Sequence, residues 1–222
     1  MPAQRWSDVD EYIETLFLPP DAAFDEALAS SNDAGLPPIS VSYAQGKFLG
    51  LLAKMSGARR ILEIGTLGGF STIWLARSLP PDGVVITLEL ESKHAVVART
   101  NLDRAGVGAL VDVRVGPAVA TLRDLIAQGV EPFDFIFIDA DKEGYPQYLD
   151  LTMRLARVGT VIVADNVVRD GQVVDAASDD ERVVAVREFL ELAAANERLD
   201  GDVIQTVGAK GYDGFALFIV SS

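Results

Sequence analysis

Ile61-Leu-Glu-Ile-Gly-Thr-Leu-Gly-Gly-Phe-Ser71 carries the strongest structural signal in this chain. Its first residues are apolar and predict a short strand, its glycines predict a tight turn, and Ser71-Thr-Ile-Trp-Leu-Ala76 predicts a helix. A strand, a glycine turn and a helix N-terminus together present backbone N–H groups to a carboxylate or phosphate. The stretch therefore predicts a cofactor-binding turn.

The spacing of the glycines differs from that of nicotinamide-binding proteins. Those proteins carry G-x-G-x-x-G after the strand, whereas here Gly65 is followed by Thr66 and Leu67 before Gly68-Gly69, and a carboxylate, Glu63, stands near the end of the strand. This spacing disfavours a dinucleotide. The alternative is an ordinary βα turn, in which the glycines only supply positive φ angles.

Composition limits the class of protein. The chain has 222 residues, 49% of them hydrophobic, which is enough for one sizeable core and too few for two comfortable domains. We expect a single domain over 1–222, with N-terminal helices over 1–57 and an α/β core over 58–222. Because the net charge is -14, nucleic acid is not expected as a partner, and small molecules fit better.

Cysteine and histidine are scarce. The absence of cysteine excludes disulfides, thiolate nucleophiles and cysteine-ligated zinc. His94 is the one histidine, so two-histidine metal sites are excluded, and we expect His94 to be a solvated surface residue. The N-terminus has no apolar signal region and no run reaches membrane-spanning length, so we expect a cytoplasmic protein without a membrane segment.

The rest of the chain alternates between strand-like and helix-like segments. Helices are predicted from the N-cap Ser7 to Phe17, over 21–31, and over 43–55. Apolar runs without alternation, typical of strands covered on both faces, are found at 60–64, 84–90, 111–115, 133–138 and 159–164. They predict a parallel, doubly wound α/β sheet. Segments 202–207 and 214–220, joined by a turn at 208–214, predict a closing antiparallel hairpin and bring the sheet to seven strands.

Ligands of such sheets bind at the carboxyl ends of the strands. The second strand ends in Glu89, about two dozen residues after the glycine turn, where these folds bind the two hydroxyls of a ribose. Glu91 is a rival, although it also suits a helix N-terminus. The third strand ends at Gly116-Pro-Ala118, a corner of small residues that can admit an adenine.

Oxygen-bearing side chains follow the fourth and fifth strands. Asp139, Asp165 and Asn166 have the ligand chemistry of a hard-cation site, for which magnesium is the natural choice, and Lys142 lies beside the first of them. Helix capping and turn formation are the alternative roles of such strand-end residues.

These pieces resemble the cation-dependent class I S-adenosylmethionine O-methyltransferases, a family that includes caffeoyl-CoA and catechol O-methyltransferases. The resemblance runs from about residue 36 to the end and is most specific in Phe133-Asp-Phe-Ile-Phe-Ile-Asp-Ala-Asp-Lys142, which Tyr145 and Tyr148 follow. It is also carried by Ile39-Ser-Val-Ser42, by the glycine turn, by Asn101-Leu-Asp-Arg-Ala-Gly106, and by Asp165-Asn166 with Gly171-Gln-Val173.

The resemblance implies a role for each matching residue. Glu63, Gly65 and Ser71 would line the methionine end of S-adenosylmethionine, with Val41, Thr66 and Asp139 as further cofactor contacts. Glu89 would bind the ribose, and Gly116 and Ala118 the adenine edge. Asp139, Asp165 and Asn166 would hold Mg²⁺ or another divalent cation, and Tyr148 would contact the acceptor. The family is often dimeric through its N-terminal helices, which implies a homodimer here.

The implied reaction moves a methyl group to one hydroxyl of a catechol-like vicinal diol. A cation bound to both oxygens lowers their pKa values and fixes them in place. Lys142 then takes the proton, provided that the cation and burial depress its pKa, or else remains a positive group that steadies the phenolate. The alternative for Lys142 is a surface ion pair with Asp141 or Glu143.

The sequence departs from the family pattern at Val167-Val168-Arg169-Asp170, where relatives usually carry an aromatic residue that packs the acceptor ring. We therefore hypothesise that Arg169 lies at the acceptor mouth and favours acidic catechols; a surface pair with Asp170 is the alternative. Two other functions stay open: a cofactor-binding protein without turnover, and a nicotinamide-dependent reductase on the same fold.

Overall fold

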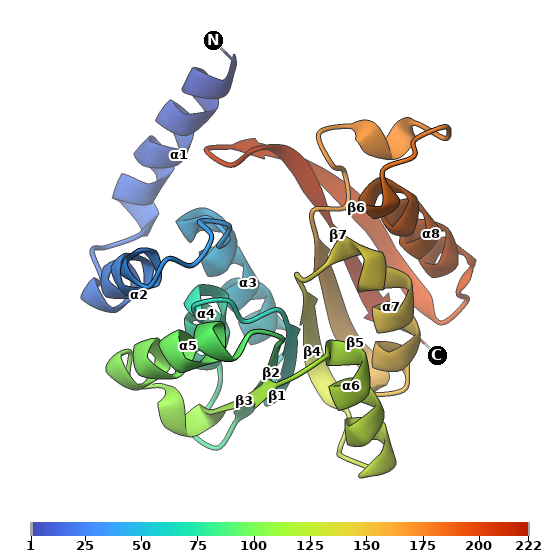
Figure 1. Cartoon of the computed structure of the whole chain (residues 1–222), viewed down its shortest axis with the longest axis horizontal. Helices are drawn as coiled ribbons and strands as arrows, with labels where there is room; N and C mark the ends of the chain where they lie inside the picture. The colour runs from blue at the N-terminus through green and yellow to red at the C-terminus, as the bar shows by residue number, and fades with distance from the viewer. Residues whose placement is uncertain (1, 222) are drawn as a thin grey trace.

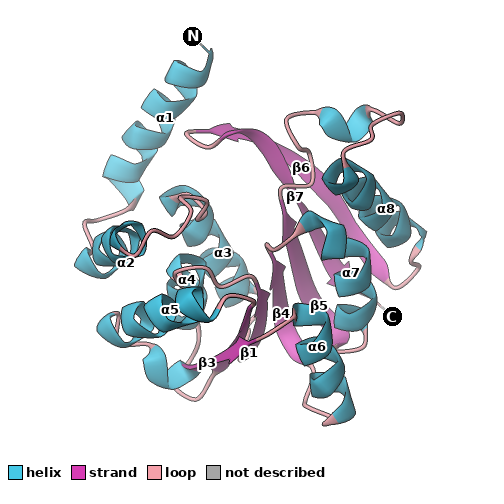
Figure 2. Cartoon of the chain, viewed as in Figure 1, coloured by secondary structure: helices cyan, strands magenta, loops and turns pink. Residues whose placement is uncertain are grey.

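The computed structural model describes residues 2–221 as a seven-stranded sheet with helices on both faces (Figures 1 and 2). The strand order is β3-β2-β1-β4-β5-β7-β6. The first five strands pair in parallel, while β7 pairs antiparallel with both β5 and β6. The predicted doubly wound sheet with a C-terminal antiparallel hairpin is confirmed.

The elements follow one another in the predicted alternation. The strands are β1 (Arg60–Ile64), β2 (Val84–Glu89), β3 (Val111–Val115), β4 (Phe133–Ile138), β5 (Ala156–Asp165), β6 (Leu199–Gly208) and β7 (Gly211–Val220). The α-helices are α1 (Pro2–Phe17), α2 (Ala22–Asp33), α3 (Tyr43–Met55), α4 (Phe70–Ser78), α5 (Ser92–Arg104), α6 (Ala118–Ala127), α7 (Tyr145–Met153) and α8 (Glu181–Ala195).

A hydrophobic core lies on each face of the sheet. In β4, Phe135 and Phe137 pack in the core under α2, α3, α4 and α5, whereas Ile136 and Ile138 pack in the core under α6, α7 and α8. Successive strand residues point to opposite faces, so a strand covered on both sides is apolar throughout. This explains the continuous apolar run that predicted β4.

The N-terminal helices differ in how far they join this core. Phe24 and Ala27 of α2 and Leu49 and Ala53 of α3 are buried with the sheet residues. Helix α1, in contrast, projects beside the tip of the β6–β7 hairpin (Figure 1), where the Asp10 carboxylate accepts a hydrogen bond of 2.7 Å from the backbone N–H of Ala209.

Several predicted boundaries are wrong, among them the start of β6, which lies at Leu199 and not at 202. Helix α1 begins at Pro2, so Ser7 lies within the helix and is not its N-cap. Strand β5 begins at Ala156, three residues before the predicted 159, because its first residues pair with the start of β4 at the edge of the core. The hairpin turn is also shorter than 208–214, since Gly208 already pairs with Gly211.

No helix among the described residues is long and apolar enough to cross a membrane.

Candidate active site

A cavity of about 750 Å³ opens at the carboxyl ends of the parallel strands. It lies where the strand order reverses between β1 and β4, which is the position at which open α/β sheets bind ligands. Most of the residues predicted from the sequence line it, namely Val41, Gly65, Thr66, Ser71, Glu89, Ala118, Asp139, Lys142, Tyr148, Asn166 and Arg169. Three predicted residues, Glu63, Gly116 and Asp165, are not part of its wall.

The glycine turn forms one wall of the cavity. Gly65 has a φ of +104°, and a Cβ atom there would lie 1.9 Å from the carbonyl oxygen of Asp139. Only glycine fits this position, because the turn must pass directly over the end of β4. The turn residues Gly65, Thr66 and Leu67 thereby line the cavity.

Glu89 is fixed beside this turn. Its carboxylate accepts hydrogen bonds from the backbone N–H of Leu67 at 2.7 Å and of Glu91 at 2.9 Å, and His94 Nδ1 lies 3.3 Å from Oε1. Because a carboxylate has about four acceptor positions, these partners leave room on Oε2 for a ligand hydroxyl. The interpretation of His94 as a solvated residue is wrong, since its side chain is only 20% exposed and lines the cavity.

Glu63 lies behind the wall and has no exposed surface. Its carboxylate accepts hydrogen bonds from the hydroxyls of Ser71 at 2.7 Å, Thr72 at 2.5 Å and Thr87 at 2.6 Å. Burial raises the pKa of Glu63 to about 7, against the opposing effect of these hydroxyls. The expected direct contact with a cofactor is therefore corrected: Glu63 points toward α4 and orients Ser71, which does reach the cavity.

The predicted adenine corner is reached by Pro117, Ala118 and Val119 at the start of α6. Gly116 lies just before these residues with a φ of +138° and shapes the bend that brings them to the cavity.

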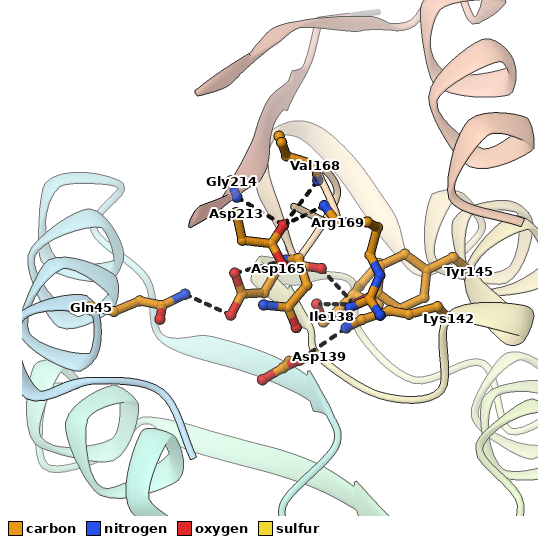
Figure 3. A network of polar contacts seen from close by, with 11 residues as sticks. Gln45, Ile138, Asp139, Lys142, Tyr145, Asp165, Val168, Arg169, Asp213 and Gly214 are labelled. Carbon is orange, nitrogen blue, oxygen red and sulfur yellow. Dashed lines mark hydrogen bonds and ion pairs between the residues drawn. The ribbon is translucent and has the colours of Figure 1, made fainter. Parts of the chain in front are cut away.

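Asp139, which follows β4, and Asp165, the last residue of β5, face the same space (Figure 3). Asp165 is 5% exposed, and its carboxylate accepts hydrogen bonds from Gln45 Nε2 at 2.6 Å and from the Asn166 backbone N–H at 2.8 Å. Burial and the neighbouring Asp139 carboxylate raise the pKa of Asp165, while Lys142 acts in the opposite direction. A buried carboxylate and a partly exposed one that repel each other favour a nearby positive charge.

Asp139, Asp165 and Asn166 offer oxygen atoms, the type of ligand that a hard cation prefers. Among residues 2–221 no group of three or more Asp, Glu or His side chains is placed to hold a metal ion. The predicted set has two carboxylates and completes its oxygen ligands with the Asn166 amide, in keeping with the preference of Mg²⁺ for oxygen and for retained waters.

Lys142 is buried in the same wall, with 7% of its surface exposed. Its Nζ lies 3.1 Å from Asp139 Oδ1 and donates to the Tyr145 hydroxyl at 2.6 Å. The Tyr145 hydroxyl in turn lies within hydrogen-bond distance of the carbonyl oxygens of Ile138 and Asp165. The alternative surface pair of Lys142 with Asp141 or Glu143 is therefore wrong.

Tyr148 and Arg169 border the remaining side of the cavity. The Tyr148 hydroxyl donates to Asp141 at 2.6 Å, and burial together with this carboxylate raises the pKa of Tyr148. Arg169 runs toward Lys142 and Tyr145 (Figure 3), and no ion pair joins it to Asp170 among the described residues.

Sequence reasoning missed three residues that shape the site. Gln45 comes from α3 and reaches Asp165 across 120 positions of the chain, and Asp213 of β7 binds the loop after β5. No sequence motif near Gln45 or Asp213 indicates these contacts. Tyr145 stood in the quoted motif, and its spacing of three residues from Lys142 was the available clue.

The fold and the cavity define a Rossmann-like protein with a ligand-sized cavity beside a cluster of carboxylates and a buried lysine. A family model for O-methyltransferases matches residues 23–217, and the chain belongs to this family. It is an S-adenosylmethionine-dependent O-methyltransferase, as the resemblance implied.

Known relatives cover nearly the whole chain. A catechol O-methyltransferase from Mycobacterium tuberculosis is 55% identical over 213 residues, 96% of this chain and 95% of the relative. The structure of an O-methyltransferase from Bacillus cereus in complex with SAH is 50% identical, with a TM-score of 0.97 over 99% of this chain and 100% of the other. The O-methyltransferase TomG from Streptomyces achromogenes, solved in complex with SAM, is 45% identical with a TM-score of 0.97 and full coverage of both chains.

Proposed function

We propose that this enzyme transfers the methyl group of S-adenosylmethionine to one hydroxyl of a catechol-like vicinal diol held by a divalent cation, with Mg²⁺ as the natural choice. The main observation that supports this proposal is that the Asp139 and Asp165 carboxylates lie close to Lys142 at the cavity (Figure 3). The names of the relatives agree, since a 55% identical protein is a catechol O-methyltransferase.

The metal ligands in this proposal are Asp139, Asp165 and Asn166. A cation held by these residues would supply Lewis acidity to the diol. Gln45 holds the Asp165 carboxylate in place by its hydrogen bond. Asn166 lines the cavity, and its backbone has a φ of +56°, an uncommon angle for a residue with a side chain.

The proton leaves the acceptor hydroxyl as the oxygen–carbon bond forms and the carbon–sulfur bond breaks. Lys142 is proposed to accept this proton at Nζ, or to remain a cation that steadies the phenolate. Tyr145 limits the movement of Nζ through its hydrogen bond. Burial and the Asp139 and Asp165 carboxylates raise the pKa of Tyr145 well above its ordinary value, so its phenol stays neutral.

The cofactor contacts remain those predicted, except for the direct one from Glu63. Glu89 is proposed to bind the ribose, Gly116 and Ala118 to shape the adenine side, and Ser71 with Val41, Gly65, Thr66 and Asp139 to line the methionine end. The fixed position of Glu89 and the presence of the glycine turn in the cavity wall support this orientation.

We further propose one domain over 1–222, a homodimer and a cytoplasmic location. The shared core of α2, α3 and the sheet supports the single domain. The dimer is supported by apolar residues of α1 that face solvent, among them Tyr12 at 66%, Leu16 at 59% and Phe17 at 68% exposure.

The test compares acceptors whose hydroxyls differ only in position. Catechol should be methylated in the presence of Mg²⁺, whereas phenol and resorcinol, which cannot present two adjacent oxygens to one cation, should react at least about tenfold more slowly. Equal rates for the three would overturn the vicinal-diol proposal. Membership of the O-methyltransferase family argues against the nicotinamide-dependent reductase, and turnover on catechol would remove the binding protein without turnover.

A further inference from the structure

Arg169 is unusual among the cations that line the cavity. Its side chain makes no hydrogen bond or ion pair with any described residue, and its Nε atom is shielded from solvent without a partner. Lys142 is paired with Asp139, and Arg182 is paired with Asp180 at 2.6 Å. Of these three cations, only Arg169 has no ion-pair partner among the described residues.

A shielded Nε–H group without an acceptor is costly, because it loses its hydrogen bonds to water and gains none in return. The only other buried side-chain N or O atom without a partner among the described residues is Trp74 Nε1, in α4 packed against Gly46 of α3. The unsatisfied donor of Arg169, by contrast, belongs to a residue of the cavity wall. This arrangement indicates an anionic group of a ligand.

The backbone that carries Arg169 is strained. Asn166, Arg169 and Asp170 have φ angles of +56°, +57° and +53°, which side-chain-bearing residues rarely adopt. Such strain persists only where surrounding structure enforces it, and it clusters at ligand sites. One loop therefore carries both the metal-ligand candidate Asn166 and the unpaired guanidinium.

Asp213 of β7 holds this loop in place (Figure 3). Its Oδ1 atom accepts hydrogen bonds from the backbone N–H groups of Val168 at 3.0 Å, Arg169 at 2.9 Å and Gly214 at 2.9 Å. Bonds to a charged acceptor are stronger than neutral ones. The carboxylate therefore links the sheet edge directly to the residue whose side chain enters the cavity.

We propose that Arg169 selects acceptors that carry a carboxylate near the diol, and that Asp213 is the positioning residue that holds Arg169 for this contact. The inference rests on the proposed function, because the anion is placed on the molecule whose diol is methylated. A planar guanidinium binds a carboxylate through two parallel hydrogen bonds.

The first experiment measures kcat/KM for 3,4-dihydroxybenzoate and for its neutral amide with Mg²⁺. The wild type should prefer the acid, and Arg169→Gln should lower the acid-to-amide ratio by about tenfold or more. Arg169→Lys should restore only part of the ratio, because an ammonium cannot bind in bidentate fashion. Arg123→Gln removes the same charge from an exposed position of α6 and should leave the ratio unchanged.

The second experiment tests Asp213. Asp213→Asn should lower the acid-to-amide ratio in the wild-type background and should not change it further in Arg169→Gln, whereas a general loss of loop structure would slow both acceptors equally in both backgrounds. If Arg169→Gln leaves the ratio of kcat/KM for the acid to that for the amide unchanged, the inference is overturned. The proposed function would still stand. Failure of the wild type to methylate either diol would instead contradict the proposed function itself.

Discussion

The Glu89 carboxylate is held by two backbone N–H groups and is 7% exposed, so it enters the cavity without freedom to move away. Glu89→Ala should weaken S-adenosylmethionine binding more than tenfold, because hydrogen bonds to a charged group contribute roughly 1.5–3 kcal/mol. Calorimetry measures this directly. Glu91→Ala, which removes the exposed rival carboxylate, should change the affinity far less, and the reverse order would assign the ribose contact to Glu91.

Lys142 combines burial with contacts to Asp139 and Tyr145. Lys142→Ala should reduce turnover by about two to four orders of magnitude, the usual effect of removing a positioned acid or base, with cofactor affinity retained. Lys142→Arg should not restore the rate, since a guanidinium stays protonated. Single-turnover kinetics are the measurement, and rescue by arginine would make Lys142 an electrostatic group.

Glu63 predicts a pH dependence of stability. Its pKa is raised from 4.5 to about 7, so the folded state holds a proton that the unfolded state releases between these two values. The free energy of unfolding therefore falls by roughly 3 kcal/mol as the pH rises from about 4.5 to about 7, and it is constant above that pH. Glu63→Gln removes this effect.

The corresponding measurement is chemical unfolding in chelator at pH 5 and pH 8. The variant should gain stability relative to the wild type at the higher pH, while Glu131→Gln, an exposed control, should show no such change. A difference between Glu63→Gln and the wild type that is the same at both pH values would show that burial does not hold the proton on Glu63.

Single residues show where sequence reasoning succeeds and where it fails. Glu89 and Asp139 were found because they end predicted strands, whose carboxyl ends meet at one edge. Glu63 was placed on the cavity, yet its side chain points toward α4, because neighbouring strand residues face opposite sides. His94 was expected in solvent, since the sequence does not show that α5 starts against Glu89.

Among the elements, α1 is the least integrated. It is amphipathic, as its sequence predicted, but the residues Val9, Tyr12, Ile13, Leu16 and Phe17 are all at least 39% exposed. If α1 joins two copies, Leu16→Asp should convert a dimer into a monomer in light scattering, whereas Thr15→Asp, on a neighbouring exposed position, should not. A wild type that is monomeric at high concentration would refute the dimer.

The central strands were predictable because each is an apolar run bounded by turns, and β1, β3 and β4 begin and end where expected. The early start of β5 and the tight β6–β7 turn were not, since pairing with neighbouring strands extends a strand beyond its apolar centre. Loop geometry was equally hidden: the contact between Asp213 and Arg169 joins residues 44 positions apart.

In the molecule as a whole, a chain of net charge -14 brings the buried Asp165 carboxylate and the partly exposed Asp139 carboxylate to one edge of its sheet. Lys142 supplies one positive charge beside these two carboxylates, and a bound cation is proposed to supply the rest in the working enzyme. Asp165→Ala and Asn166→Ala should each abolish methyl transfer while cofactor affinity stays nearly constant, as measured by calorimetry beside the turnover assay.

The decisive measurement is methyl transfer from S-adenosylmethionine to catechol by the wild-type enzyme, first in chelator and then after Mg²⁺ is added in excess. The proposed mechanism predicts no turnover above background in chelator, full recovery with the cation, and an affinity for the cofactor that is the same in both conditions. Equal turnover with and without the cation would contradict it and leave a methyltransferase that relies on Lys142 alone.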